Sequence, residues 1–246
     1  MTHAEVLQIL ENNKPISIVR AGDGEKIVLE SNTNIEAYQL CINSVMKRQM
    51  GYEPTMSEVE AIRENLIEAY KGADIIGIPM QKNLNDLGKH WNGVAKIIDQ
   101  YNTTSPRCSL DICYDMLYDG SLIDWLRNKP VVNYISCRDL DEGFYRIGIK
   151  QPNKFIIAPE AKFTTYHGEQ HYPGQFNNVE RWMSKIAIEG NPCLVGAGVI
   201  GKIYCNWFRD RGGIAIDIGA VFDLLAGKST RGPGRGLDVT NETYKL

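Results

Sequence analysis

The stretch ISIVRAGDGE, residues 16–25, decides the fold that we expect for this chain. Residues 16–19 are apolar enough for a buried strand, which Gly22 and Gly24 then break. Glycine-rich turns that follow strands lie at the carboxyl edge of an open α/β sheet, where such folds bind ligands. Asp23 and Glu25 would supply oxygen ligands for a divalent cation, and Arg20 would supply paired donors for phosphate. The turn therefore predicts a site for a metal-bound diphosphate.

The same stretch also fits a β-hairpin. Asp-Gly between two β-like runs is a strong hairpin signal, and residues 16–19 and 26–29 would be its two arms. Short motifs of Asp and Glu often arise by chance. Spacing alone therefore leaves both interpretations open.

Length and composition indicate one globular domain. The chain has 246 residues, 43% of them hydrophobic and 23% charged, with a net charge of −3. We predict a single domain over residues 1–246, ending in a flexible Gly/Arg-rich tail from about residue 228. The chain has no basic run that would favour nucleic acid, no apolar run of the roughly 20 residues that a membrane span needs, and no signal peptide. The six cysteines form no CxxC pair, so we expect reduced thiols in the cytoplasm rather than a zinc site.

Predicted strands and helices alternate through most of the chain. The helix expected at 35–49 has apolar residues at 35, 38, 42 and 45, with the polar Gln49 next on the same spacing, and Ser57 with Glu60 fits a capping box. This alternation predicts an α/β, Rossmann-like fold, with a mostly parallel sheet and helices on both faces. Besides residues 16–19, we expect strands at 75–78, 131–136, 155–158, 193–195 and 214–218, and helices at 4–12, 35–49, 57–72, 81–98, 121–127, 178–189, 203–208 and 221–225.

Gly196, Gly198 and Gly201 match the pattern G-x-G-x-x-G between a strand and a helix. Glycines there let the backbone approach a phosphate, which the helix N-terminus would bind. Asp217 ends the next strand, where a ribose-binding carboxylate would lie in a dinucleotide fold, although it could also cap the following helix. Ile203 replaces the Ser or Thr of a P-loop, which argues against an ATPase. The glycines could also serve only strand–helix packing.

Two further groups are candidate contacts for a substrate. His167 and His171 lie in a segment expected to be a loop, and His167 is our candidate catalytic base. Arg231 and Arg235 lie in the tail and could close over a diphosphate, although such residues are commonly just solvated.

The motif at residues 18–25 resembles the start of the GT-D fold glycosyltransferases, in which a strand precedes R-x-G-D-G-E. Residues 194–202 and 213–223 are similar to the C-terminal half of that family. Members often carry Phe where this chain has Ala21, a position that we expect to serve packing. The resemblance covers both ends of the chain, and residues 80–175 are less informative.

The resemblance implies a hexosyltransferase of the GT-D type, which moves a sugar from a nucleotide donor, often UDP-glucose, to a glycan or glycoprotein. It implies that Asp23 and Glu25 bind Mg²⁺ or Mn²⁺. It also implies that the nucleotide lies against the two glycine turns. Two other classes remain open: an NAD(P)-dependent Rossmann oxidoreductase that uses residues 196–201 and Asp217, and an inactive nucleotide-binding subunit of a glycan assembly complex. The predicted nucleotide contacts are Arg20, Gly22, Gly24, Gly196, Gly198, Asp217 and Arg231.

Overall fold

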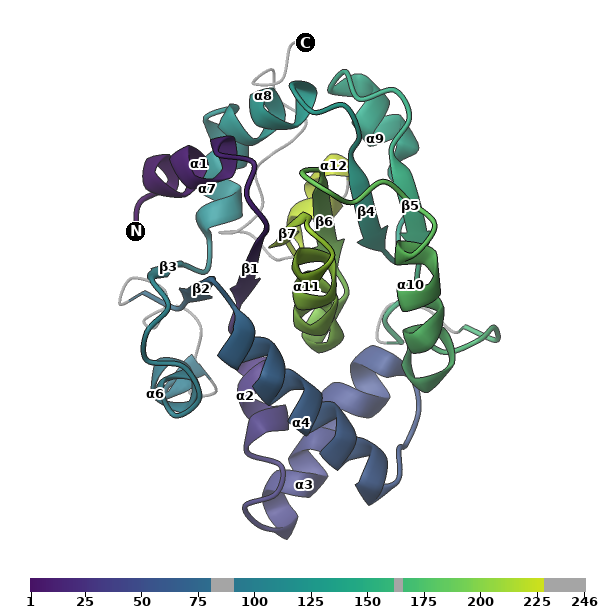
Figure 1. Ribbon diagram of the computed structural model, residues 1–246. Coiled ribbons are helices and arrows are strands. Elements are labelled where there is room, and N and C mark those ends of the chain that lie inside the picture. Colours follow the sequence, from purple (N-terminus) through teal and green to yellow (C-terminus); the bar gives the residue numbers. More distant parts are fainter. Residues whose placement is uncertain (81–90, 162–165, 228–246) are drawn as a thin grey trace.

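The computed structural model describes residues 1–80, 91–161 and 166–227, and in these residues seven strands form one sheet (Figure 1). Neighbouring strands are parallel throughout, in the order β3-β2-β1-β7-β6-β4-β5. The predicted Rossmann-like α/β fold is therefore confirmed. The strands are β1 (Ile16–Arg20), β2 (Ile75–Ile78), β3 (Arg107–Ser109), β4 (Asn133–Ser136), β5 (Asn153–Ile156), β6 (Pro192–Gly196) and β7 (Ile214–Asp217).

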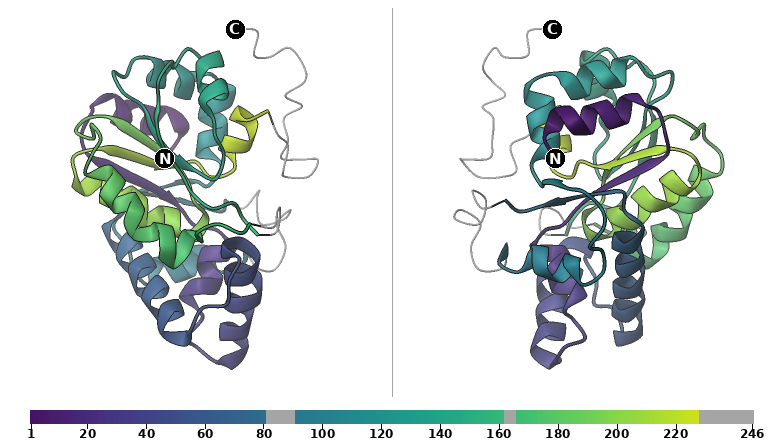
Figure 2. Two further views of the ribbon diagram at one scale, coloured as in Figure 1. Left: turned by 90° about the vertical axis from the view of Figure 1, so that its right-hand side faces the viewer. Right: turned by 60° about the vertical axis from the view of Figure 1, so that its left-hand side comes forward.

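Helices cover both faces of the sheet, because successive strand residues point to opposite sides (Figure 2). Val19 and Ala215 face one apolar core, whereas Ile18 and Ile216 face the other. The first core is closed by α2 (Asp23–Leu29), α3 (Ile35–Cys41), η1 (Ile42–Met50), α4 (Met56–Gly72), α6 (Val94–Asp99), α10 (Phe176–Met183) and α11 (Gly201–Asp210). The second is closed by α1 (His3–Glu11), α7 (Ile112–Tyr118), α8 (Ser121–Arg127), α9 (Asp141–Arg146) and α12 (Val221–Leu225).

A crevice opens at the carboxyl ends of the neighbouring strands β1 and β7. The chain leaves β1 into α2 on one face of the sheet and leaves β7 into α12 on the other. Ligands in open α/β sheets bind where the chain turns to opposite faces in this way. The strand order therefore brings the acidic turn after β1 beside Asp217, the last residue of β7.

The hairpin interpretation of residues 16–29 is wrong. β1 pairs with β2 on one side and β7 on the other, so no edge remains for a second arm. Residues 26–29 belong to α2, whose Ile27, Val28 and Leu29 are buried in the first core. The Asp-Gly pair begins this helix.

Several boundaries differ from those predicted. The helix expected at 35–49 divides into α3 and the π-helix η1. Helix α4 begins at Met56, one residue earlier than expected, and its capping box is formed by Thr55 and Glu58, not by Ser57 and Glu60. The strand expected at 155–158 lies at 153–156, and α10 is shorter than predicted. The sequence patterns missed the short elements β3, α7 and α9. Residues 81–90 of one predicted helix and the tail from residue 228 lie outside the described residues.

No helix in the described part of the chain combines the length and the apolar character that crossing a membrane requires.

Candidate active site

The turn after β1 forms the N-terminus of α2. Gly22 is its N-cap in an extended conformation, and the Gly22 N–H donates to Oε2 of Glu25 at 2.8 Å. The carboxylate of Asp23 accepts a hydrogen bond from the N–H of Gly24 at 2.9 Å. Both predicted metal ligands therefore lie in the first turn of a helix, where the helix dipole favours negative charge.

Lys202, in the first turn of α11, links this turn to those after β6 and β7. Its Nζ lies 2.5 Å from Oε1 of Glu25 and 3.0 Å from Oδ2 of Asp217, and donates to the carbonyl oxygen of Gly198 at 2.9 Å. The side chains of Lys202, Glu25 and Asp217 are only 6%, 9% and 2% exposed. One buried ammonium thus fixes three turns relative to one another.

Arg20 lies on the other side of Asp217. Its Nη2 is 3.5 Å from Oδ1 of Asp217, and its Nη1 donates to the carbonyl oxygen of Leu110 at 3.3 Å. Gly219, with a φ of +50°, leaves room for the guanidinium, because a β-carbon at this position would overlap Nη2. Within the described residues, the buried Nε of Arg20 has no hydrogen-bond partner. Arg20 thus lines the crevice and contains one buried donor that the described residues leave unpaired.

Asp217 and Lys202 remain ionised at neutral pH. Burial opposes the charge of Asp217, but Lys202 and Arg20 outweigh it and lower the pKa of this carboxyl. Burial likewise opposes the charge of Lys202, but Asp217 and Glu25 outweigh it and raise the pKa of the ammonium. Each charged form is stabilised by its opposite partners.

These residues line a cleft of about 420 Å³ at the carboxyl edge of the sheet. Arg138, just beyond β4, forms the far wall with Asp223 of α12, and their Nε and Oδ1 atoms lie 2.6 Å apart. Ser44, Arg48 and Gln49 of η1 and the half-buried Trp91 complete the cleft. Among the described residues its lining includes six carboxylates, of Asp23, Glu25, Asp111, Glu160, Asp217 and Asp223, but four cations, of Arg20, Arg48, Arg138 and Lys202.

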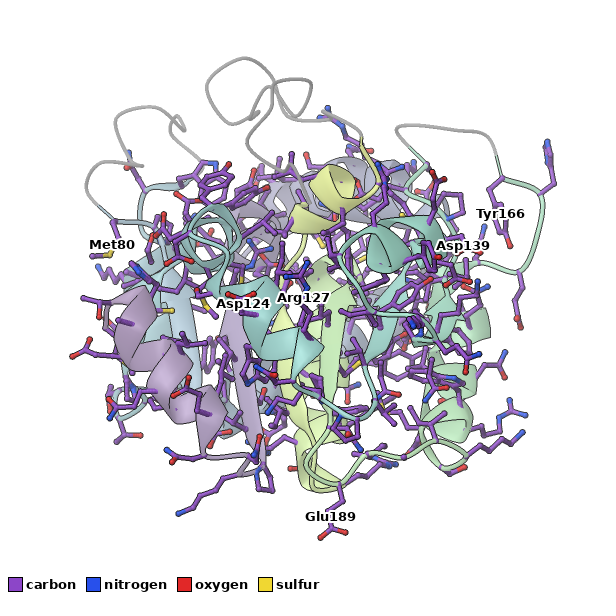
Figure 3. The ribbon with its side chains drawn as sticks, turned by 90° about the horizontal axis from the view of Figure 1, so that it is seen from above. Met80, Asp124, Arg127, Asp139, Tyr166 and Glu189 are labelled. Atoms are coloured by element: carbon purple, nitrogen blue, oxygen red, sulfur yellow. The ribbon has the colours of Figure 1, made fainter. Side chains whose placement is uncertain are left out.

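Most of the residues predicted for the site line this cleft, His167 does not, and one further residue lies outside the described part of the chain. His167 is exposed and is not among the lining residues, and its neighbour Tyr166 lies at the outer edge of the molecule (Figure 3). Arg231 lies outside the described residues. The residues brought together are Arg20, Gly22, Asp23, Gly24, Glu25, Gly196, Gly198 and Asp217.

His171 has a structural environment. It is buried, and its Nε2 lies 2.9 Å from the hydroxyl oxygen of Tyr204, with which it forms a hydrogen bond. Burial lowers the pKa of His171 from 6.5 to about 4. The unfolded chain, with its higher pKa, therefore binds a proton more readily than the folded protein.

We expect His171 to make the protein less stable as the pH falls from about 6.5 to about 4. Proton uptake by the unfolded state should cost about 3 kcal/mol of stability at the lower end of this range, and nothing above it. The measurement is urea unfolding of the wild type and of His171→Phe at several pH values. The stability difference between the two proteins should change across this range. The matched control is His3→Gln, at a histidine whose side chain is 44% exposed and lies 3.0 Å from Asp119, and it should change the pH dependence less. A constant difference between wild type and His171→Phe would contradict the assignment.

The two glycines of the turn between β6 and α11 have different roles. A β-carbon at Gly196 would overlap the ring of Phe222, so this glycine permits close packing. Gly198 has a φ of +55°, and a β-carbon there would lie 3.2 Å from Oε1 of Gln49, inside the cleft. Packing alone, one of the interpretations from sequence, therefore accounts for Gly196 but not for Gly198.

Alanine at each glycine should separate these roles. We expect Gly196→Ala to lower the free energy of unfolding by about 1–3 kcal/mol through overpacking. Gly198→Ala should cost about 1–2 kcal/mol of backbone strain, and it should also weaken nucleotide binding in the folded protein. Thermal unfolding and UDP titration would measure both effects. UDP affinity that falls equally in the two variants would show that the distinction is wrong.

The sequence interpretation underestimated two residues of the cleft. Lys202 belongs to the stretch that resembles the GT-D family and ends an incomplete P-loop pattern, but neither feature predicts that it is buried between two carboxylates. Trp91, whose ring lies beside Gly22 at the cleft, is not among the residues predicted for the site. No local pattern indicated this position.

The donor set limits how a metal could bind. Among the described residues, no group of three or more His, Cys, Asp or Glu side chains could enclose an ion. Glu25 already uses one oxygen for the Gly22 N–H and the other for Lys202. Asp23 is half-buried in the cleft wall. These residues fit a hard cation that takes one or two carboxylates and draws its other ligands from substrate phosphate and water, as Mg²⁺ commonly does.

Comparison with known proteins gives a family and a shared fold. The model of a family described as "GT-D fold-like domain" matches residues 2–140. A solved structure described as "A New Glycosyltransferase (DUF1792) from Streptococcus sanguinis" superposes with a TM-score of 0.62 at 14% identity, covering 93% of this chain and 85% of that chain. Another, of a domain described as having "a distinct glycosyltransferase fold", gives a TM-score of 0.57 at 14% identity, covering 93% and 82%. No curated protein matches the sequence.

Proposed function

The chain belongs to the family of GT-D fold-like domains and is a glycosyltransferase, and from this premise we propose that it uses a UDP-linked sugar with Mg²⁺ or Mn²⁺. The observation that carries the proposal is the buried network of Glu25, Lys202, Asp217 and Arg20. This network holds the acidic turn after β1 against the glycine turn before α11. A diphosphate between the two turns would contact both.

The phosphates would bind through donors that the fold already positions. Arg20 lines the crevice with its guanidinium, whose buried Nε has no hydrogen-bond partner in the part of the chain that the structure describes. The turn at η4 (Gly198–Ile200) leads into the N-terminus of α11, where N–H groups and the helix dipole favour an anion. When the bond to the sugar breaks, negative charge grows on the departing diphosphate. Donors fixed in advance stabilise that charge without the cost of reorganising.

The charge of the cleft supports a role for a metal ion. Six carboxylates and four cations line it among the described residues, so a diphosphate would enter a region of net negative charge. A divalent cation, when bound, would offset this repulsion and the charge on the leaving group. We assign its direct ligation to Asp23. Glu25 would orient the turn, because its oxygens are engaged by Gly22 and Lys202.

The acceptor would be a hydroxyl of a glycan or glycoprotein. The β1 and β6 turns would hold the diphosphate, which leaves the wall at β4 to the acceptor. Arg138 and Asp223 form that wall as an ion pair with side chains 20% and 15% exposed. A partly exposed pair can make hydrogen bonds to hydroxyl groups. A catalytic role for His167 remains a prediction.

An NAD(P)-dependent oxidoreductase is less well supported by the geometry. In that reading the carboxylate of Asp217 would accept hydrogen bonds from a ribose. Both of its oxygens instead face cations of this chain, Lys202 and Arg20, and the side chain is 2% exposed.

Thermal shift with a nucleotide-sugar panel would test the proposal. UDP-glucose, UDP-galactose, UDP-N-acetylglucosamine, GDP-mannose and NADH would each be added with Mn²⁺ or with EDTA. We expect a UDP-sugar to raise the melting temperature only with Mn²⁺, because a ligand that binds the folded state stabilises it. Stabilisation by NADH alone would overturn the proposal. Binding of a UDP-sugar without transfer or hydrolysis in any acceptor screen would point to an inactive subunit.

A further inference from the structure

The π-helix η1 presents three polar side chains to the cleft. The N–H of Gly51 donates to the carbonyl oxygen of Met46, five residues earlier, at 2.9 Å. This spacing places residues four and five apart on one face. Ser44, Arg48 and Gln49 accordingly all line the cleft. Gln49, the polar residue on an otherwise apolar stripe in the sequence, is therefore turned toward the ligand site and not into the core.

The amide of Gln49 lies between the two glycine turns. Its Nε2 is 3.3 Å from the place that a β-carbon at Gly24 would occupy, and its Oε1 is 3.2 Å from the corresponding place at Gly198. The backbone carbonyl of Gln49 accepts a hydrogen bond from the N–H of Ala161 at 3.2 Å, which fixes this end of η1. The amide thus lies within reach of both turns that would hold the diphosphate.

This amide has no partner among the described residues. No hydrogen bond within residues 1–80, 91–161 and 166–227 engages the side chain of Gln49, although it is half-buried. A side chain that lines the cleft without a partner in the described part of the chain is available to a ligand. The cations and helix N-terminus around it suit phosphate oxygens, which only accept hydrogen bonds. An amide both donates and accepts, and a sugar hydroxyl does the same.

We propose that Gln49 is a specificity-determining residue that binds a hydroxyl group of the transferred sugar. The inference rests on the proposed function, because it requires a nucleotide-sugar donor between the two turns. It assigns the diphosphate to the turns and the sugar to the amide that spans them. The affinity gained from the sugar, as distinct from the nucleotide, should therefore depend on Gln49.

The experiment compares the ratio of the Kd for UDP to the Kd for a UDP-sugar in the wild type with the same ratio in Gln49→Met. Calorimetric titration with Mn²⁺ gives the Kd of UDP and of the tightest-binding UDP-sugar among UDP-glucose, UDP-galactose and UDP-N-acetylglucosamine. Wild-type protein should bind the UDP-sugar more tightly than UDP. Gln49→Met, of similar volume but without the amide, should lose about three- to tenfold in affinity for the UDP-sugar and keep its affinity for UDP. Gln39→Met, the same change on the exposed side of α3, is the matched control.

The other outcomes overturn the inference in distinguishable ways. An unchanged ratio in Gln49→Met, an equal loss for UDP, or a wild type that prefers UDP would overturn the role of Gln49 and leave the proposed function standing. A wild type that binds none of these UDP compounds would overturn both. If Gln49→Met does not fold, Gln49→Asn gives the same readout, because its shorter amide cannot reach the same hydroxyl.

Discussion

Replacing Lys202 by methionine is expected to lower the free energy of unfolding by about 3–5 kcal/mol. The ammonium lies within 3.0 Å of carboxylate oxygens of both Glu25 and Asp217. Methionine has a similar length but no charge, so both carboxylates would stay buried without their shared partner. Removing one member of a buried ion pair is costly because the remaining charge has lost its hydration as well. Urea unfolding measured by circular dichroism gives the change.

A lysine on the surface provides the matched control. The Nζ of Lys154 lies 2.7 Å from Oδ2 of Asp139, and its side chain is 32% exposed. Pairs of this kind contribute about 1 kcal/mol or less, so Lys154→Met should change stability little. Combining Lys202→Met with Glu25→Gln should recover part of the loss, because it also removes one of the stranded charges. Equal stability of Lys202→Met and Lys154→Met would show that the network does not hold the turns together.

Local signals in the sequence were sufficient to predict much of the fold and the two glycine turns of the site. An apolar run that stops at glycine predicts a strand and its turn, and this held at Gly22 and at Gly196. Both turns belong to strands of a parallel sheet, whose carboxyl ends lie at one edge. The sequence therefore predicted that the residues of these two turns would meet at one edge of the sheet.

The partners of these residues could not be predicted from local patterns. Lys202 meets Glu25 because β7 lies between β1 and β6, an order that appears only when the sheet assembles. The stripe at 35–49 predicted one α-helix, but π-helical bonding after Ile42 changes which residues share a face. Gln49 consequently reaches the cleft, whereas a continuous α-helix would have placed it differently. The short elements β3, α7 and α9 have too few residues to give a clear period.

The two carboxylates of the acidic turn are expected to respond differently to neutralisation. Asp23→Asn should reduce activity by about 100-fold or more and make UDP affinity insensitive to Mn²⁺, because a direct metal ligand is removed. It should unfold like the wild type, since Asp23 is half-buried and its hydrogen bond to Gly24 is local. Glu25→Gln should also lose activity, but through loss of stability, because it leaves Lys202 with one fewer carboxylate.

Measuring stability and metal dependence on the same proteins separates the two roles. In Asp23→Asn, a urea midpoint equal to that of the wild type together with loss of the Mn²⁺ effect on the Kd of UDP would support ligation by Asp23. Asp210→Asn, at an exposed aspartate paired with Arg209, controls for the substitution itself. In Glu25→Gln the midpoint of urea unfolding should fall. The effect of Mn²⁺ on the Kd of UDP should persist in the protein that remains folded, because Glu25 holds Lys202 and orients the turn without binding the ion. If Asp23→Asn keeps the Mn²⁺ effect and Glu25→Gln loses it, the metal replaces Lys202 at Glu25, and the ion pair belongs only to the ligand-free protein.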